Sequence, residues 1–266
     1  MRFDKIIDKK KPVILTLNYN ELYLYNMISL LTDYQIVVYQ CTGYKPLHEI
    51  NERLDVFTAE TITPDIIPDV VICQYIEYHY ETCREIADTY GCPLIIVEHN
   101  APSNNNKGIH NAIKSDKVVF YSNEHYGLWV GCGNTNLRDS IKNAVVIPPT
   151  AIPEKNSRTV GAITPFKTHE LSLINEVLQA MVNKNCVIVP KMWEINKAIQ
   201  QYKNGIFFNN QDPLHSIEKL TSLLDHRDSY SLRKKIGQDA YNTVLEKYSN
   251  ESFIKNWYKV LDGVLL

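Results

Sequence analysis

Short runs of apolar, mostly β-branched residues recur through the first 150 residues and constrain the fold more than any other feature of the chain. These runs are Val13–Leu17, Gln35–Tyr39, Asp69–Cys73, Pro93–Val97, Lys117–Tyr121 and Ala144–Ile147. Most of them are continuous rather than alternating, which is typical of strands that are buried on both faces of a parallel sheet. The sequence therefore predicts an α/β fold with such a sheet in this part of the chain.

Helical stretches separate several of the apolar runs. Glu21–Leu31 carries apolar residues roughly along one side, and Tyr75–Tyr90 repeats that pattern with Ile76, Tyr80, Cys83, Ile86 and Ala87. Strands that alternate with helices imply right-handed βαβ crossovers and a doubly wound sheet. Ligands of such sheets bind beyond the carboxyl ends of the strands, so polar residues directly after the apolar runs are the first site candidates.

Three prolines, Pro148, Pro149 and Pro153, indicate a linker and a domain boundary. We therefore expect one domain over residues 1–150 and a second over residues 151–266. The second has few strand candidates: Val160–Ile163, Cys186–Val189 and Gly205–Phe208. Helices are predicted at Pro213–Leu224 and Tyr230–Tyr248, and a last segment, Glu251–Leu261, is predicted to cross back onto the first domain.

Bulk composition excludes several classes of protein. The chain has 266 residues, enough for about two domains, and its net charge of −2 gives no global bias toward nucleic acid. No apolar run approaches the ~18 residues that a membrane-spanning helix needs. The six cysteines form no Cys-x-x-Cys pair, so reduced thiols are expected and a zinc site is not. These features predict a cytoplasmic protein, and the frequent Asn, Ile and Lys indicate an AT-rich genome, that of a bacterium or of a virus in an infected cell.

The last third of the chain carries motifs in a recognisable order. Thr159–Lys167 reads Thr-Val-Gly-Ala-Ile-Thr-Pro-Phe-Lys, the apolar segment Cys186–Pro190 follows, and Asn204-Gly205 precedes Ile-Phe-Phe. This order resembles the nucleotide-sugar-binding half of retaining GT-B glycosyltransferases of the GT4-like group. The resemblance implies a GT-B-like fold, with two Rossmann-like doubly wound domains that face a cleft, and here with a reduced second domain.

The same resemblance implies an activity. The chain would be a hexosyl- or pentosyltransferase that uses a nucleotide sugar, most commonly a UDP-sugar, retains the anomeric configuration and needs no metal. In the family the leaving phosphate itself is thought to assist the reaction, in line with the lack of an obvious general base.

Donor-binding candidates come from matching positions in the second domain. Lys167 stands where the family has a phosphate-binding lysine, although Ala162 replaces the accompanying arginine, and Thr164 lies in the same segment. The alternative is a solvated lysine at the start of a helix. Trp193 and Glu194 occupy a loop that is glycine-rich in the family, and are candidates for the cleft; simple packing of the tryptophan is the alternative.

Two acidic residues spaced Glu-x7-Glu are a further family motif. Glu170 fits the first, which contacts the donor sugar, and is a catalytic candidate. The second, which binds the ribose, is matched imperfectly: Glu176 is close in spacing, while Gln179 takes the matching place before Ala180-Met181. Two registers stay open, and charges favoured by the helix dipole are the alternative for both acids.

In the first domain, candidates follow predicted strands. His99 stands where the family often has a histidine that reaches toward the transferred sugar, and it is the second catalytic candidate; a buried structural histidine is the alternative. Asn18, Tyr19, Asn100 and Asn123 are candidates for the acceptor side. Ser122 before Asn123 is first of all a helix N-cap signal.

The sequence leaves the acceptor open. A surface glycan or a lipid-linked sugar is common in the family, and would place the protein peripherally at a membrane. A hydroxymethylated base in phage DNA is the other acceptor considered, and it would have to be flipped out of the duplex. Rival interpretations are a non-catalytic binding or scaffold protein with a decayed GT-B fold, and a GT-B-like sugar-nucleotide epimerase.

Overall fold

The structure is a computed structural model that describes residues 11–19, 21–39, 56–59, 66–134, 143–153, 173–191, 195–208, 212, 218, 220–221 and 229–266. The chain forms two compact units. Unit 1 comprises Met1–Pro148 together with Ile254–Leu266, and unit 2 comprises Pro149–Phe253.

Unit 1 is built on a parallel sheet of seven strands in the order β3-β2-β1-β4-β5-β6-β7. The strands are β1 (Val13–Leu17), β2 (Gln35–Tyr39), β3 (Val56–Ala59), β4 (Val70–Cys73), β5 (Leu94–Val97), β6 (Lys117–Phe120) and β7 (Ala144–Val146). All six predicted apolar runs are strands, within one or two residues at their ends. The structure adds β3, which the sequence analysis missed.

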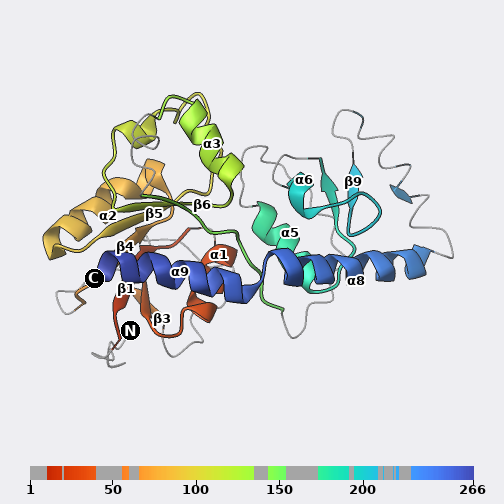
Figure 1. The fold of residues 1–266 in the computed structure, drawn as a ribbon, viewed down its shortest axis with the longest axis horizontal. Coiled ribbons are helices and arrows are strands. Elements are labelled where there is room, and N and C mark those ends of the chain that lie inside the picture. The colour runs from red at the N-terminus through yellow and green to blue at the C-terminus, as the bar shows by residue number, and fades with distance from the viewer. Residues whose placement is uncertain are drawn as a thin grey trace. The chain divides into compact units, whose positions relative to one another are not determined.

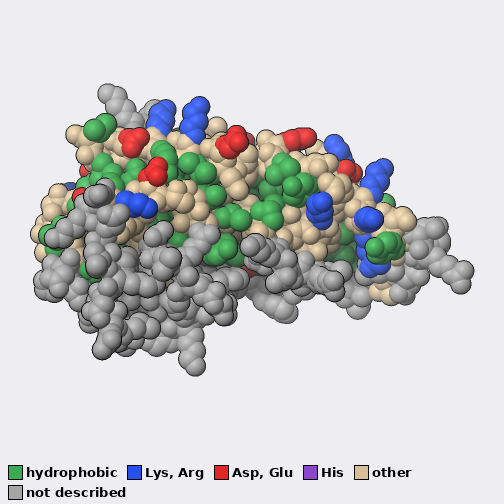
Figure 2. Space-filling view, turned by 90° about the horizontal axis from the view of Figure 1, so that it is seen from below, with side chains coloured by type: hydrophobic (Ala, Val, Ile, Leu, Met, Phe, Trp, Pro, Cys, Tyr) green, Lys and Arg blue, Asp and Glu red, His purple; other side chains and the backbone are tan. Residues whose placement is uncertain are grey.

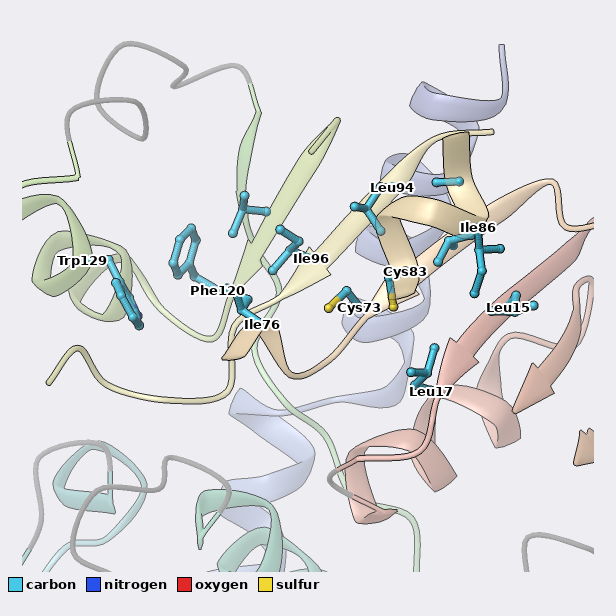
Figure 3. Close-up of a cluster of buried hydrophobic side chains, with 13 residues drawn as sticks. Leu15, Leu17, Cys73, Ile76, Cys83, Ile86, Leu94, Ile96, Phe120 and Trp129 are labelled. Atoms are coloured by element: carbon cyan, nitrogen blue, oxygen red, sulfur yellow. The ribbon is translucent and has the colours of Figure 1, made fainter. Parts of the chain in front are cut away.

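Helices cover both faces of this sheet (Figure 1). α2 (Ile76–Tyr90) and α3 (Asn123–Gly131) lie on one face, where the largest group of buried side chains joins alternate strand residues such as Leu17 and Phe120 to Cys83 and Trp129 (Figure 3). Four of the five apolar residues expected on one side of α2 are buried, which confirms the helical periodicity.

The opposite face carries α1 (Glu21–Leu30) and α9 (Asn250–Leu265). The indole Nε1 of Trp257 on α9 donates to the hydroxyl of Tyr23 on α1 across 3.2 Å, and both side chains are fully buried. At the surface, the hydroxyl of Tyr258 donates to Asp33 at 3.0 Å. The end of the chain therefore completes the core of unit 1.

Unit 2 contains α5 (Leu173–Val182), β8 (Ile188–Pro190), α6 (Ile195–Ala198), β9 (Ile206–Phe208) and α8 (Ser229–Lys247). β8 and β9 pair in parallel, and Cys186, Ile206 and Ile236 form a buried cluster. Two predicted strands are thus present, each starting one or two residues later than expected. The third, Val160–Ile163, and most of the helix predicted at Pro213–Leu224 lie outside the described residues.

Candidate functional site

The strand order of unit 1 fixes where a site is to be sought. Connections run outward from β1 to β2 and β3 in one direction, and from β4 to β7 in the other, so the order reverses between β1 and β4. In open α/β sheets, ligands bind at the carboxyl ends of the strands beside such a reversal. The residues at this edge are Asn18 and Tyr19 after β1, Gln74 and Tyr75 after β4, Glu98–Asn100 after β5, and Tyr121 after β6.

Alternation along β5 sends neighbouring side chains to opposite faces. Leu94 and Ile96 belong to the core beneath α2 and α3, and Glu98 continues on that side. His99 falls on the other side, where its ring meets Tyr23 of α1 edge-on, with 5.0 Å between the ring centroids. A single strand end therefore supplies both a histidine to the α1 face and a carboxylate to the α3 face.

His99 is 1% exposed and is surrounded by tyrosines. Its Nδ1 is hydrogen-bonded to the hydroxyl of Tyr121, and its ring lies 5.7 Å from that of Tyr19. Burial, and secondarily the nearby His125, lowers the pKa of His99 to about 3. The ring is therefore neutral at physiological pH, and it offers hydrogen bonds rather than positive charge to a ligand.

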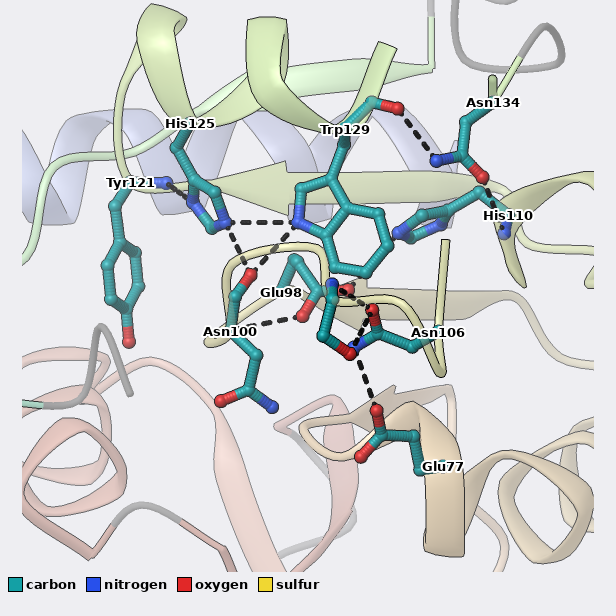
Figure 4. Close-up of polar contacts among 10 residues, drawn as sticks. Glu77, Glu98, Asn100, Asn106, His110, Tyr121, His125, Trp129 and Asn134 are labelled. Atoms are coloured by element: carbon teal, nitrogen blue, oxygen red, sulfur yellow. Dashed lines mark hydrogen bonds and ion pairs between the residues drawn. The ribbon is translucent and has the colours of Figure 1, made fainter. Parts of the chain in front are cut away.

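The backbone of Asn100 is held from the α3 side (Figure 4). The amide of Tyr121 donates to Nδ1 of His125 at 3.3 Å, which places the proton of that neutral ring on Nε2. Nε2 then donates to the carbonyl of Asn100 at 2.9 Å, and the indole of Trp129 donates to the same carbonyl at 2.9 Å. These hydrogen bonds hold the backbone of Asn100, the residue that follows His99, in place.

Glu98 anchors the other side of the same loop. One carboxylate oxygen accepts from the amide of Asn100 at 3.1 Å, and the other lies 3.1 Å from Nε2 of His110, with both side chains buried. A hollow next to this pair is lined by Tyr75, Ile76, Glu77, Glu98, Asn100, Asn106, Ile109 and Trp129. Asn106 donates to Glu77 across it at 2.8 Å, as Figure 4 shows.

An aromatic group that was not predicted from the sequence lies at the same edge. Tyr19 and Tyr75 stack with 4.3 Å between ring centroids and 18° between ring planes, and Tyr78 lies 4.9 Å from Tyr75. The ring of His79 meets both Tyr19 and Tyr75 edge-on. Gln74 and Tyr75 follow a buried strand just as Asn18 and Tyr19 do, and that position was the signal available in the sequence.

Of the candidates predicted in the first domain, four come together at this edge: Asn18, Tyr19, His99 and Asn100. Asn123 differs, because it is the exposed first residue of α3. Ser122 before it is the N-cap, and its hydroxyl accepts from the amide of His125 at 3.1 Å, as the sequence predicted.

In unit 2 the structure describes one of the predicted donor-binding residues. Glu176 lies exposed in the first turn of α5. Gln179, its competitor for the matching position, is buried and donates to the carbonyl of Ile152 at 2.8 Å. Thr164, Lys167, Glu170, Trp193 and Glu194 lie outside the described residues.

The described residues hold no group of three or more His, Cys, Asp or Glu side chains placed to bind a metal ion. None of the helices within the described ranges is both long and apolar enough to cross a bilayer.

Comparison with solved structures gives the fold. The chain superposes on a glycosyltransferase from Rickettsia africae with a TM-score of 0.57 and 13% identity, covering 96% of this chain and 99% of the other. HepE from Anabaena in complex with UDP-glucose gives a TM-score of 0.66 at 9% identity, over 94% of this chain and 99% of the other. The chain has a GT-B-like fold.

Sucrose-phosphate synthase from Thermosynechococcus elongatus is a further GT-B-like neighbour, with a TM-score of 0.59 at 8% identity, over 95% of this chain and 99% of the other. No family model matches the chain, and no curated protein matches it. The likeness is therefore one of fold, and it spans nearly the whole length of each GT-B-like neighbour.

Proposed function

We propose that this protein is a glycosyltransferase that moves a sugar from a nucleotide sugar, a UDP-sugar in the first instance, to an acceptor. The observation that carries the proposal is the similarity to HepE in complex with UDP-glucose, which extends over 94% of the chain. The polar edge of unit 1 supports it, because Asn18, Tyr19, His99 and Asn100 gather at the position where doubly wound sheets bind ligands.

In the reaction, the bond between the anomeric carbon and the diphosphate oxygen breaks, and a bond forms from an acceptor oxygen to that carbon. The acceptor proton leaves with the diphosphate, and the anomeric configuration is retained. Lys167 and Thr164 would bind the diphosphate, Glu170 the donor sugar and Glu176 the ribose, with Trp193 and Glu194 lining the donor site. A resident metal is not part of the proposal.

In unit 1, His99 would contact the transferred sugar. As a neutral ring it can donate to, or accept from, a hydroxyl group, and it cannot act as a cation toward the leaving diphosphate. Charge stabilisation is therefore assigned to Lys167 and to backbone N–H groups of unit 2. Asn18, Tyr19 and Asn100 belong to the acceptor side, and Asn123 is a more distant candidate.

The test is release of UDP from UDP-glucose by the full-length chain, with and without a mixture of candidate acceptors. A transferase releases UDP faster with an acceptor and yields a product whose anomeric configuration can be read by NMR. Conversion of the donor without any acceptor would instead identify an epimerase. Binding of UDP-glucose without turnover, and unaltered by Lys167→Ala and Glu170→Ala, would favour the non-catalytic binding protein.

A further inference from the structure

Two amide side chains at the point where the strand order reverses lack the hydrogen bonds that buried groups require. Asn18 is 8% exposed, and neither its Nδ2 nor its Oδ1 has a partner among the described residues; the same holds for Oε1 of Gln74, which is 1% exposed. A buried polar group of this kind has lost its hydrogen bonds to water without replacement, which destabilises the folded state. Such a cost at a strand end points to a ligand that supplies the missing bonds.

These two amides share one face of the sheet. The pairing of Thr16 with Ile72 in β1 and β4 sets a register that brings Asn18 and Gln74 opposite each other, two residues further on. Nε2 of Gln74 donates to the hydroxyl of Thr16 at 3.0 Å, which confirms that both side chains lie on that side. By the same alternation this is the face toward α1, where the ring of His99 lies.

Aromatic residues directly follow the two amides at the same strand ends, and the ring of Tyr19 reaches to 5.7 Å from that of His99 on the α1 side. Tyr19 follows Asn18 and Tyr75 follows Gln74, and these two rings form the stacked pair described above. Tyr78 continues the row and is 75% exposed, so its ring is available to a ligand. Nδ1 of His79, at the edge of the pair, is another buried atom without a partner among the described residues.

This combination matches the chemistry of a saccharide. An amide both donates and accepts hydrogen bonds, as neighbouring sugar hydroxyl groups do, and exposed tyrosine rings offer an apolar surface to the C–H face of a sugar ring. Binding sites that combine aromatic walls with a few convergent polar groups are the usual form for small ligands.

The charged side chains around the site indicate whether its ligand is a neutral saccharide or a phosphorylated one. The described residues at this edge, 18–19, 74–79, 98–106 and 121–125, contain no lysine or arginine, and they include Glu77, Glu98 and Glu124; Lys107 directly follows the third range. Lysine and arginine are the side chains that most often bind phosphate, whether on a sugar or along DNA. On the face that Figure 2 shows, the Lys and Arg side chains of the described residues are interspersed with Asp and Glu side chains.

We infer that Asn18, Gln74, Tyr19, Tyr75 and Tyr78 bind an uncharged saccharide, which is the part of the acceptor that receives the sugar. The inference rests on the proposed transferase function for the role of this saccharide, and it narrows the acceptor to a glycan rather than a sugar phosphate or a base in DNA. Binding itself needs no donor, so it can be measured separately.

The test uses the full-length chain without donor. Saturation-transfer NMR and calorimetry are carried out with a panel of neutral p-nitrophenyl hexosides, with hexose 6-phosphates, and with an oligonucleotide that contains 5-hydroxymethylcytosine. We expect at least one neutral hexoside to bind, and the phosphates and the oligonucleotide to bind at least tenfold more weakly. Preferred binding of a phosphorylated ligand, or no binding of any hexoside, would overturn the inference.

Three variants locate the site. Tyr78→Ala and Asn18→Leu should each weaken hexoside binding about tenfold or more, as expected for the loss of a buried contact or hydrogen bond. Tyr230→Ala is the matched control, because Tyr230 is a similarly exposed tyrosine, at 67%, on α8 of unit 2. Unchanged hexoside affinity in Tyr78→Ala and Asn18→Leu would contradict the assignment.

Asn18→Leu also separates a binding role from a structural one. Because the amide of Asn18 has no partner in the described protein, leucine should leave the ligand-free melting temperature unchanged or raise it. A fall of several degrees would mean that the amide serves folding, and it would overturn the inference. UDP should bind the unaltered chain and all three variants with the same affinity. If the unaltered chain binds the hexoside but does not bind UDP, the transferase proposal fails and the saccharide site stands.

Discussion

His99 is kept neutral by burial among tyrosine rings, and this has a consequence for stability at acidic pH. The pKa of His99 is about 3 in the folded chain, against an ordinary value near 6.5. Between those values the unfolded chain binds a proton that the folded chain does not, so acid favours unfolding. The contribution of the neutral ring to the free energy of unfolding is fully present above pH 6.5 and is lost progressively as the pH falls below that value.

Two results are expected for His99: its ring signals should not change with pH, and the free energy of unfolding should depend on pH through this residue. NMR of the ring carbons should show no protonation of His99 from pH 8 down to pH 5. The free energy of unfolding should fall by about 1.4 kcal/mol per pH unit below pH 6 through this residue, and His99→Gln should remove that slope. Protonation of the ring with a midpoint near pH 6.5 would contradict the buried environment.

Among individual residues, the sequence could identify only part of the group at the carboxyl ends of the strands of unit 1. His99, Asn18, Tyr19 and Asn100 were found because each follows a strongly apolar run. Tyr75, Tyr78 and His79 were assigned to the amphipathic helix that starts there, and the helical pattern hid their position at the edge. That Asn18 lacks partners depends on the three-dimensional surroundings of its side chain, which no local pattern contains.

Among the elements of unit 2, α8 packs against the turn after α5 so closely that only glycine fits at position 237. A Cβ on Gly237 would lie 2.1 Å from the carbonyl oxygen of Lys184 and 2.9 Å from its carbonyl carbon. The residue is helical, so the constraint comes from packing rather than from its backbone angles. Backbone atoms cannot move aside as a flexible side chain can.

Gly237→Ala should therefore destabilise unit 2 by about 1–3 kcal/mol or more, since it forces α8 away from the turn. Gly263→Ala is the matched control: it lies in α9 with no atom within 4 Å of the added Cβ, and it should be neutral or stabilising by about 0.5–1 kcal/mol. Urea unfolding followed by circular dichroism measures both. Equal stability of the two variants would contradict the close packing.

At this scale the sequence predicted most elements of unit 1. Continuous β-branched runs identified six strands, because strands buried on both faces leave that signature. β3 was missed because Val56–Ala59 holds only three apolar residues and stands between two acidic residues, Asp55 and Glu60. The order of the strands follows from pairing between distant segments, and the sequence gives it only as a general rule for doubly wound sheets.

For the molecule as a whole, α9 ties the end of the chain to the core of unit 1. Trp257, Val260 and Leu261 are buried, and Trp257 bonds to Tyr23, which in turn contacts His99. Loss of α9 would therefore open the core directly beside the candidate site.

Trp257→Ala should destabilise unit 1 by about 3–5 kcal/mol. Hydrogen exchange measured by mass spectrometry should rise in α1 and around His99, while α5 and the C-terminal half of α8 keep their protection. Tyr258→Phe, which removes one surface hydroxyl bonded to Asp33, is the control and should cost about 1 kcal/mol or less. Increased exchange confined to unit 2 would refute this role of α9.

Nearly full-length similarity to GT-B enzymes makes nucleotide-sugar binding the central claim. The measurement that tests it most directly is calorimetric titration of UDP-glucose into the full-length chain, its Lys167→Ala variant and Lys203→Ala, which replaces an exposed lysine of unit 2. The account predicts saturable binding that weakens tenfold or more in Lys167→Ala and is unchanged in Lys203→Ala. Absence of binding by UDP-glucose, UDP and other nucleotide sugars would contradict it.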